Sequence, residues 1–183
     1  MKRLFVISGS SGVGKGTVLK EFLAKHSDFK LSISCTTRSM RPGEVDGVNY
    51  FFLSKDDFKK GINEGDFLEW AEFSDNYYGT RKSFIEKALK NGENIILEIE
   101  TQGALQVKKL MPDAVLIFIA PPSFEELEQR LRGRQTESEE VIQKRLNQAA
   151  REKEDSKNYH YVIINDTISA TVEKLEEIIA NYV

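Results

Sequence analysis

The sequence contains few of the residues that build disulfides and metal centres. It has a single cysteine, Cys35, and two histidines, His26 and His160, which lie far apart along the chain. One cysteine cannot form an internal disulfide, so the chain is typical of a reducing compartment. The histidines lack the spacing of metal ligands, and we expect neither of them to bind a metal.

Long apolar runs and a strong net charge are also missing. The longest uncharged apolar stretch, residues 114–120, is too short to cross a bilayer, and the run 4–7 is too short for a signal peptide. The formal net charge of −3 draws the chain neither to nucleic acid nor to an anionic membrane. We therefore expect a soluble cytoplasmic protein with small-molecule partners; its state as a monomer or a homo-oligomer stays open.

Short apolar runs alternate with amphipathic segments along the 183 residues. Four continuous runs occur at residues 4–7, 95–97, 115–119 and 162–164. Continuous runs suit parallel strands that helices cover on both faces, whereas strands with one wet face alternate. The pattern predicts an α/β fold with a three-layer core.

Two stretches depart from this alternation. Residues 34–80 hold short segments rich in Tyr, Phe and turn residues, which predict a small mixed β insert. In residues 125–157, Lys and Arg are nearly balanced by Asp and Glu. The few apolar residues there predict a helical surface flap rather than a core element. Capping-box patterns at Ser123 and Thr136 predict two helix starts, and Gly133 predicts the end of the first helix.

A glycine-rich segment follows the first apolar run. Gly9, four further residues and then Gly14-Lys15 form the spacing of a phosphate loop. The glycines let backbone N–H groups converge on a phosphate, and the Lys15 ammonium adds a positive charge. Gly16 occupies the usual Ser or Thr position, so we expect Thr17 or water to replace that hydroxyl at Mg²⁺. The loop indicates a nucleoside triphosphate, and the absence of an Asn-Lys dipeptide argues against a GTPase.

A second phosphate site is indicated by Arg38 and Arg41, three residues apart in a short loop. Arginine forks bind phosphate oxygens with two hydrogen bonds. Aromatic segments follow, and a carboxylate such as Glu69 can accept hydrogen bonds from the N1–H and N2 amino groups of guanine. The residues by themselves leave other interpretations open: a solvated pair of arginines, and for Glu69 the outward position of a half-buried strand. Phe51, Trp70 and Tyr77 are expected in the core.

Over essentially its whole length the chain resembles the guanylate kinases, which convert GMP and ATP to GDP and ADP. The matching motifs, in order, are Thr36-Thr37-Arg38, Arg41–Glu44, Gly47–Phe52, Phe67–Trp70, Tyr77–Thr80, Gln102-Gly103, Ile119–Ser123 and Arg130–Glu137. The resemblance implies ATP as co-substrate, Mg²⁺ as cofactor, and GMP and dGMP as acceptors. It also implies a phosphate-loop core (residues 1–33, 81–124 and 158–183), a GMP-binding insert (34–80) and a lid (125–157).

The resemblance further implies a role for each matching residue. The GMP phosphate is held by Arg38, Arg41, Tyr50 and Tyr78, and the guanine edge is read by Ser34, Glu69 and Thr80. ATP is bound by Gly9, Ser10, Ser11, Gly12, Val13, Gly14, Lys15, Gly16 and Thr17, with Asn165 near the adenine. The catalytic set is Lys15, Arg38, Arg130, Arg134 and Arg145, although a helix as charged as the one predicted from Thr136 toward Lys157 also suits a solvated face with i,i+4 ion pairs.

Two glutamates stand where the family commonly has aspartates. Glu98 and Glu100 are two residues apart, so on one strand they face the same side and share one site. The implied roles are a purine contact for Glu98 and a water-mediated Mg²⁺ contact for Glu100.

Two other functions compete with a guanylate kinase. One is a non-catalytic binding module of guanylate-kinase type, against which the retained Lys15 and loop glycines argue. The other is a nucleoside-monophosphate kinase of broader base specificity, which would accept AMP as readily as GMP.

Overall fold

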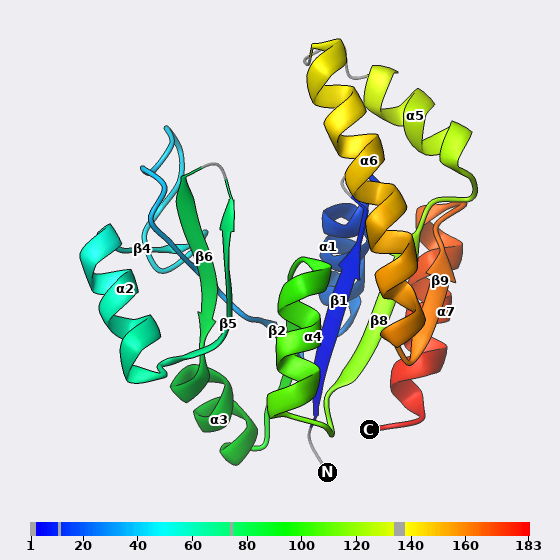
Figure 1. Cartoon of the computed structure of the whole chain (residues 1–183). Coiled ribbons are helices and arrows are strands. Elements are labelled where there is room, and N and C mark those ends of the chain that lie inside the picture. Colours follow the sequence, from blue (N-terminus) through cyan, green and yellow to red (C-terminus); the bar gives the residue numbers. More distant parts are fainter. Residues whose placement is uncertain (1–2, 11, 74, 134–137) are drawn as a thin grey trace.

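A five-stranded parallel sheet lies at the centre of the chain (Figure 1). In spatial order its strands are β2 (Phe29–Leu31), β7 (Asn94–Glu98), β1 (Leu4–Gly9), β8 (Val115–Ala120) and β9 (Tyr161–Ile164). The four predicted strands are confirmed. β2 was not predicted, because it is only three residues long and two of them are exposed. The computed structural model describes residues 3–10, 12–73, 75–133 and 138–183.

Helices cover both faces of this sheet, as the continuous apolar runs predict. The helices of one face are α1 (Lys15–Lys25) and α7 (Ile168–Ala180), and those of the other are α3 (Lys82–Lys90) and α4 (Thr101–Leu110). Phe5 and Ile7 belong to the core under α1 and α7, while Leu4 and Val6 belong to the core under α3 and α4. Successive residues of one buried strand thus supply two cores.

A second, mixed sheet lies beside the first (Figure 1). Its order is β4 (Phe51–Phe52), β3 (Cys35–Thr36), β6 (Asn76–Arg81) and β5 (Phe67–Phe73), with α2 (Lys55–Glu64) packed on it. β3 pairs with β4 in parallel and with β6 antiparallel. Phe58 of α2 stacks on Phe67 and on Tyr77, which closes a small core of its own. The predicted small mixed sheet is confirmed.

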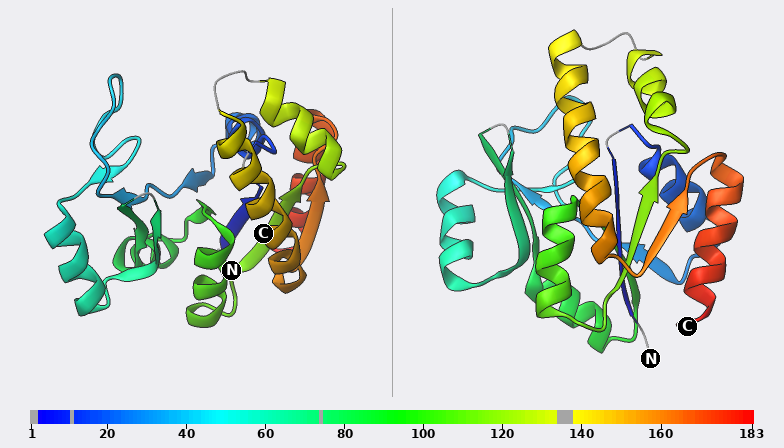
Figure 2. Two further views of the ribbon diagram at one scale, coloured as in Figure 1. Left: turned by 45° about the horizontal axis from the view of Figure 1, so that its top comes forward. Right: turned by 45° about the vertical axis from the view of Figure 1, so that its right-hand side comes forward.

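Two further helices are α5 (Phe124–Gly133) and α6 (Glu139–Asp155). α5 and the first turns of α6 project beyond the carboxyl ends of the parallel strands, and the later turns of α6 run back beside the sheet (Figure 2). The Ser123 hydroxyl accepts a hydrogen bond from the Glu126 N–H at 3.0 Å, so the predicted cap of α5 is confirmed. The predicted cap Thr136 lies outside the described residues. α6 begins at Glu139 after its N-cap Ser138, and a short 3-10 turn, Ser156–Asn158, follows it.

These two helices share a small buried cluster of their own, separate from the cores of the sheet, which was not predicted from the sequence. It consists of Leu127, Leu131, Ile142, Leu146 and Ala149. The few apolar residues recur at helical spacing, so each helix turns them all toward the other. In the part of the chain that the structure describes, no helix is long and apolar enough to cross a membrane.

Candidate active site

The glycine-rich loop joins β1 to α1 at the carboxyl end of the central strand. Gly14 is the N-cap of α1 and has a left-handed φ of 96°, and Gly12 has a φ of 86°. A Cβ on Gly9 would lie 2.2 Å from the Ile119 carbonyl oxygen, so the loop starts where the backbone permits only glycine. The first N–H groups of α1 lack partners within the helix and therefore face this loop's concave side.

An open cleft of about 480 Å³ lies against the loop. It is lined by Ser10, Gly12, Gly14, Lys15, Gly16, Thr17, Lys20, Glu98 and Glu100. The Lys15 ammonium donates a hydrogen bond to the Gly9 carbonyl at 2.5 Å. Of the predicted loop residues, the structure places Ser10, Gly12 and Gly14–Thr17 on this cleft, while Gly9 and Val13 do not line it. Ser11 lies outside the described residues.

Glu98 and Glu100 line the cleft from different elements, which corrects the prediction that one strand carries both. β7 ends at Glu98, and Glu100 is the N-cap of α4. Burial raises the pKa of Glu98, and the nearby Lys15 ammonium opposes that shift. The two carboxylates and the Lys15 ammonium therefore line one cleft, although the carboxylates do not share a strand.

Asn165 follows β9 and is buried against the same loop from the other side. Its amide donates to the Val13 carbonyl at 2.6 Å and accepts from the Thr171 hydroxyl at 2.7 Å. It also lines a second cleft of about 370 Å³, together with Gly12, Val13, Gly14, Arg130, Asp166 and Ile168. Both hydrogen-bonding ends of the Asn165 side chain are engaged within the protein, so it positions the loop as well as bordering the cleft.

The predicted lid arginines differ in how they reach these clefts. Arg130 donates to Glu126 at 3.1 Å and to the Asn165 carbonyl at 3.4 Å, which places it at the second cleft. Arg145 is half-buried on α6 and lines neither of the two clefts. Arg134 lies outside the described residues.

In the second sheet region, Arg38 is held by a carboxylate that was not assigned a role from the sequence. Its guanidinium donates two hydrogen bonds to Glu44, at 2.9 and 2.8 Å. Glu44 also accepts from the Arg41 backbone N–H at 2.8 Å. The hydrogen bonds from Arg38 lower the pKa of Glu44 most, and the bond from the Arg41 N–H lowers it next, to about 2. The Arg-Pro-Gly-Glu turn carried the signal, since it brings Glu44 back to the N–H of Arg41.

Aromatic rings surround this fork. The Arg38 guanidinium lies 5.4 Å from the centre of the Tyr50 ring, whose centre is 6.2 Å from that of Tyr78. The structure therefore brings together three of the four residues predicted to hold the GMP phosphate. The fourth, Arg41, contributes its backbone N–H, and its side chain is exposed.

The carboxylate of Glu69 is buried, in contrast to that of Glu44. Glu69 is only 5% exposed and accepts a hydrogen bond from the Thr80 hydroxyl at 2.7 Å. Burial raises its pKa to about 7, and the Thr80 contact opposes part of that shift. An interior carboxylate with one neutral partner has acceptor capacity left for a ligand. Ser34, just before β3, is half-buried, and its carbonyl accepts from the Phe51 N–H.

Trp70, the next residue, is 36% exposed, so the expectation of a core position is wrong for it, as is the outward interpretation of Glu69. The register of β5 against β6 shifts between Phe67 and Glu69. Such an irregularity changes which residues face inward, and strict alternation then fails. Phe51 and Tyr77 do pack against a core, as expected.

A buried glutamate on α6 was missed by sequence reasoning. Glu152 is 3% exposed and accepts from the Gln148 amide at 2.9 Å, while the same amide donates to Glu100 at 3.3 Å. Burial, followed by the charge of Glu100, raises the pKa of Glu152. These contacts connect α6 to the N-terminus of α4 at the first cleft.

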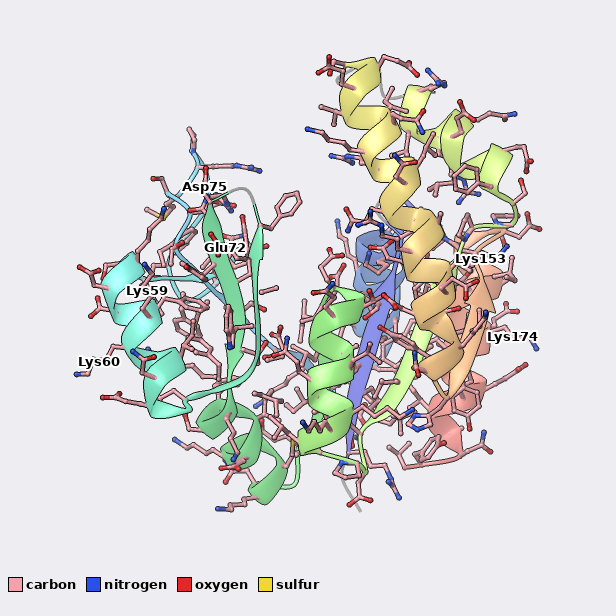
Figure 3. The ribbon with its side chains drawn as sticks, in the orientation of Figure 1. Lys59, Lys60, Glu72, Asp75, Lys153 and Lys174 are labelled. Carbon is pink, nitrogen blue, oxygen red and sulfur yellow. The ribbon has the colours of Figure 1, made fainter. Side chains whose placement is uncertain are left out.

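In Figure 3 the labels Glu72 on β5 and Lys153 on α6 mark the two parts that flank the central sheet.

Comparisons with known proteins show which family this chain is similar to. The sequence model of the family described as guanylate kinase matches residues 1–182. Among curated proteins, guanylate kinases of Desulfitobacterium hafniense and of Caldanaerobacter subterraneus subsp. tengcongensis are 53% and 54% identical to the chain. Each match covers 96% of this chain, and 88% and 85% of the two relatives. A crystal structure of guanylate kinase from Anaplasma phagocytophilum superposes with a TM-score of 0.78 at 31% identity, covering 98% of this chain and 85% of that one.

Proposed function

The chain belongs to the guanylate kinase family, and from that premise we propose which of its residues transfer a phosphoryl group from ATP to GMP. As an ATP:GMP phosphotransferase it must bind two nucleotides end to end. The observation that carries the residue assignment is the pair of dissimilar sites: a backbone cradle with Lys15, and a side-chain site with Arg38 and Glu69.

ATP occupies the two clefts that share the glycine loop. Its β- and γ-phosphates lie against the backbone N–H groups of the loop and the Lys15 ammonium. Its adenine lies toward the second cleft, near Asn165 and Arg130. The bond of Asn165 to the Val13 carbonyl supports this assignment, because it fixes the loop between both ends of the nucleotide.

GMP occupies the second sheet. Its phosphate displaces or joins Glu44 at the Arg38 fork, with Arg41, Tyr50 and Tyr78 as further donors. Glu69, Thr80 and Ser34 read the guanine edge. An ionised Glu69 accepts from the N1–H and N2 amino groups, a donor pair that adenine does not offer.

Magnesium fits the first cleft. Hard oxygen donors line it, namely the Glu98 and Glu100 carboxylates and the exposed Thr17 hydroxyl. In the described part of the chain, no cluster of three or more His, Cys, Asp or Glu side chains is arranged to hold a metal. A site with few protein ligands suits Mg²⁺, which keeps waters and binds substrate phosphates. When bound, the ion neutralises charge on the β- and γ-phosphate oxygens.

The transfer is a direct displacement. A GMP phosphate oxygen forms a bond to the γ-phosphorus while the bond from that phosphorus to the β,γ-bridging oxygen breaks, and ADP leaves. The GMP phosphate is largely ionised at neutral pH, so no strong general base is needed. The protein contributes positioning and positive charge, from Lys15 and from the arginines Arg38, Arg130, Arg134 and Arg145.

Closure of residues 34–80 and 125–157 over the core, 1–33, 81–124 and 158–183, brings these charges together and excludes water, which would otherwise hydrolyse ATP. The contact of Gln148 with Glu100 connects α6 to the core at the first cleft and supports a closing role for α6. Small-angle scattering with both nucleotides bound should show a smaller radius of gyration than the free protein. An unchanged radius would contradict closure.

The central test compares acceptors in a coupled assay of ADP release with GMP, dGMP, AMP, UMP and CMP. We expect GMP to exceed AMP by at least about 10⁴ in kcat/KM, because a site built on hydrogen bonds rejects a base that lacks them. The Glu69→Gln variant should lower that ratio by at least about 10². Equal use of AMP and GMP would favour the broader kinase, and no ADP release with any acceptor would favour a binding module.

A further inference from the structure

Helix α4 of the core is hydrogen-bonded to the backbone of β5 in the second sheet. The side-chain amide of Gln106 accepts a hydrogen bond from the Trp70 N–H at 3.1 Å and donates one to the Trp70 carbonyl at 2.9 Å. β5 is an edge strand of its sheet, so these backbone groups have no strand partner on that side. Gln106 thus supplies, from a helix, the donor and acceptor that a neighbouring strand would supply.

One turn earlier on the same helix, Gly103 is buried against the carboxylate of Glu69. A Cβ on Gly103 would lie 2.6 Å from Glu69 Oε2 and 3.3 Å from its carboxyl carbon. Gly103 has ordinary helical geometry, and glycine is unfavourable within a helix. The close approach of the carboxylate, and not the backbone conformation, therefore accounts for glycine here.

These two contacts act on adjacent residues of one strand. Residues three apart on a helix share a face, so Gly103 and Gln106 meet β5 together, at Glu69 and at Trp70. The other carboxylate oxygen of Glu69 is fixed by the Thr80 hydroxyl at 2.7 Å. Helix α4 bounds the carboxylate on one side and Thr80 bounds it on the other.

We propose that Gly103 and Gln106 are positioning residues, which fix the Glu69 carboxylate relative to the bound base and so set the preference for guanine over adenine. The inference rests on the proposed role of Glu69. Two parallel hydrogen bonds to guanine tolerate little displacement, because each weakens steeply away from its preferred distance and angle. A methyl group at position 103 would displace the carboxylate oxygen by several tenths of an ångström.

The test measures kcat/KM for GMP and for AMP, KM for ATP and the melting temperature in Gly103→Ala and Gln106→Leu. We expect the GMP-to-AMP ratio to fall by about tenfold or more in each variant, with KM for ATP within twofold of the wild type. The melting temperature of Gly103→Ala should change little, since the gain in helix propensity offsets the crowding of the new methyl group against Glu69. A residue with only a structural role would lower the melting temperature and leave the ratio unchanged.

Matched controls exist on α4 itself and on α5, away from Glu69. Gly133→Ala adds a methyl group where no atom lies within 4 Å of the new Cβ, and Gln102→Leu changes an exposed glutamine of α4. Both controls should keep the wild-type GMP-to-AMP ratio. A fall in the controls equal to that in Gly103→Ala and Gln106→Leu would overturn the assignment.

Double variants separate this inference from the role of Glu69 itself. If Gly103 and Gln106 act through Glu69, adding either substitution to Glu69→Gln should leave the GMP-to-AMP ratio where Glu69→Gln alone put it. A large effect of Glu69→Gln with no effect of the α4 substitutions overturns only the positioning role. An unchanged ratio in Glu69→Gln overturns the proposed reading of guanine and this inference with it.

Discussion

The two sheets build their proposed anion sites by different means. At the carboxyl end of β1, the central strand of the five-stranded sheet, the cradle consists of backbone N–H groups, left-handed glycines and one lysine. In the four-stranded sheet, the site consists of side chains that hold one another: Arg38 with Glu44, and Glu69 with Thr80. A site built from backbone groups depends on the local conformation of its loop and is compatible with many different surrounding side chains. A site built from side chains depends on partners from several elements.

The largest effect is expected for Lys15→Ala. Removing the one mobile charge of the cradle should lower kcat by about 10²–10³ or more, because stabilisation of the transferring phosphoryl group is lost. GMP affinity, measured by calorimetry, should stay within twofold, since the second sheet is untouched. An equal loss of GMP affinity would mean that the two sites are not separate.

The next largest effect is expected for Arg38→Met. Loss of a charged hydrogen-bond donor should raise KM for GMP by about 10–100-fold. KM for ATP should change little. Arg41→Met is the matched variant and should have a smaller effect, because the Arg41 side chain is exposed and its backbone N–H remains. Full activity of Arg38→Met with an unchanged KM for GMP would contradict the assignment.

Two carboxylates of this region should have opposite effects on stability as pH changes. The pKa of Glu69 is raised to about 7, so the native state binds more protons than the unfolded state between roughly pH 4.5 and 7. Its contribution therefore destabilises the fold progressively as pH rises through that window, by at most about 3 kcal/mol. In Glu69→Gln, the free energy of unfolding measured with urea should not show this decrease between roughly pH 4.5 and 7.

The matched variant is Glu44→Gln, with the opposite sign. The pKa of Glu44 is lowered to about 2, so its stabilising contribution is present above its unfolded pKa and is lost as pH falls toward 2. Glu44→Gln should therefore be less stable than wild type at neutral pH and approach it in acid. The same sign of pH dependence in both variants would remove the distinction between the two carboxylates.

The smallest effect is expected for Thr80→Val. Loss of the hydroxyl that donates to Glu69 removes a contact that lowers the Glu69 pKa, so the pKa should rise further. At pH 7 less of the carboxylate is ionised, and KM for GMP should rise about fivefold. Measured across pH 7 to 9, the difference from wild type should shrink as Glu69 becomes ionised.

The backbone site could be predicted from the sequence almost completely. The spacing of Gly9, Gly14 and Lys15 is local, and the apolar run before it identifies a buried strand. The same holds for the cap at Ser123, whose partner is three residues away. Local patterns carry such features because the interacting groups are neighbours along the chain.

The side-chain site could be predicted only in outline. The shift of register in β5 reverses which of Glu69 and Trp70 faces inward, and no local pattern announces it. Glu100 does not lie on the strand predicted for it, because β7 ends at Glu98 and Glu100 is already the N-cap of α4. Gln106 bonds to a residue 36 positions away, so its role depends on how the two sheets are packed.

The bond from Asn165 to the Val13 carbonyl joins residues 152 positions apart. During synthesis the glycine loop leaves the ribosome long before its anchor, Asn165, has been made. The nascent loop therefore lacks this anchor until β9 is added at the far edge of the parallel sheet. A translating chain therefore completes this pocket only after Asn165 has been made.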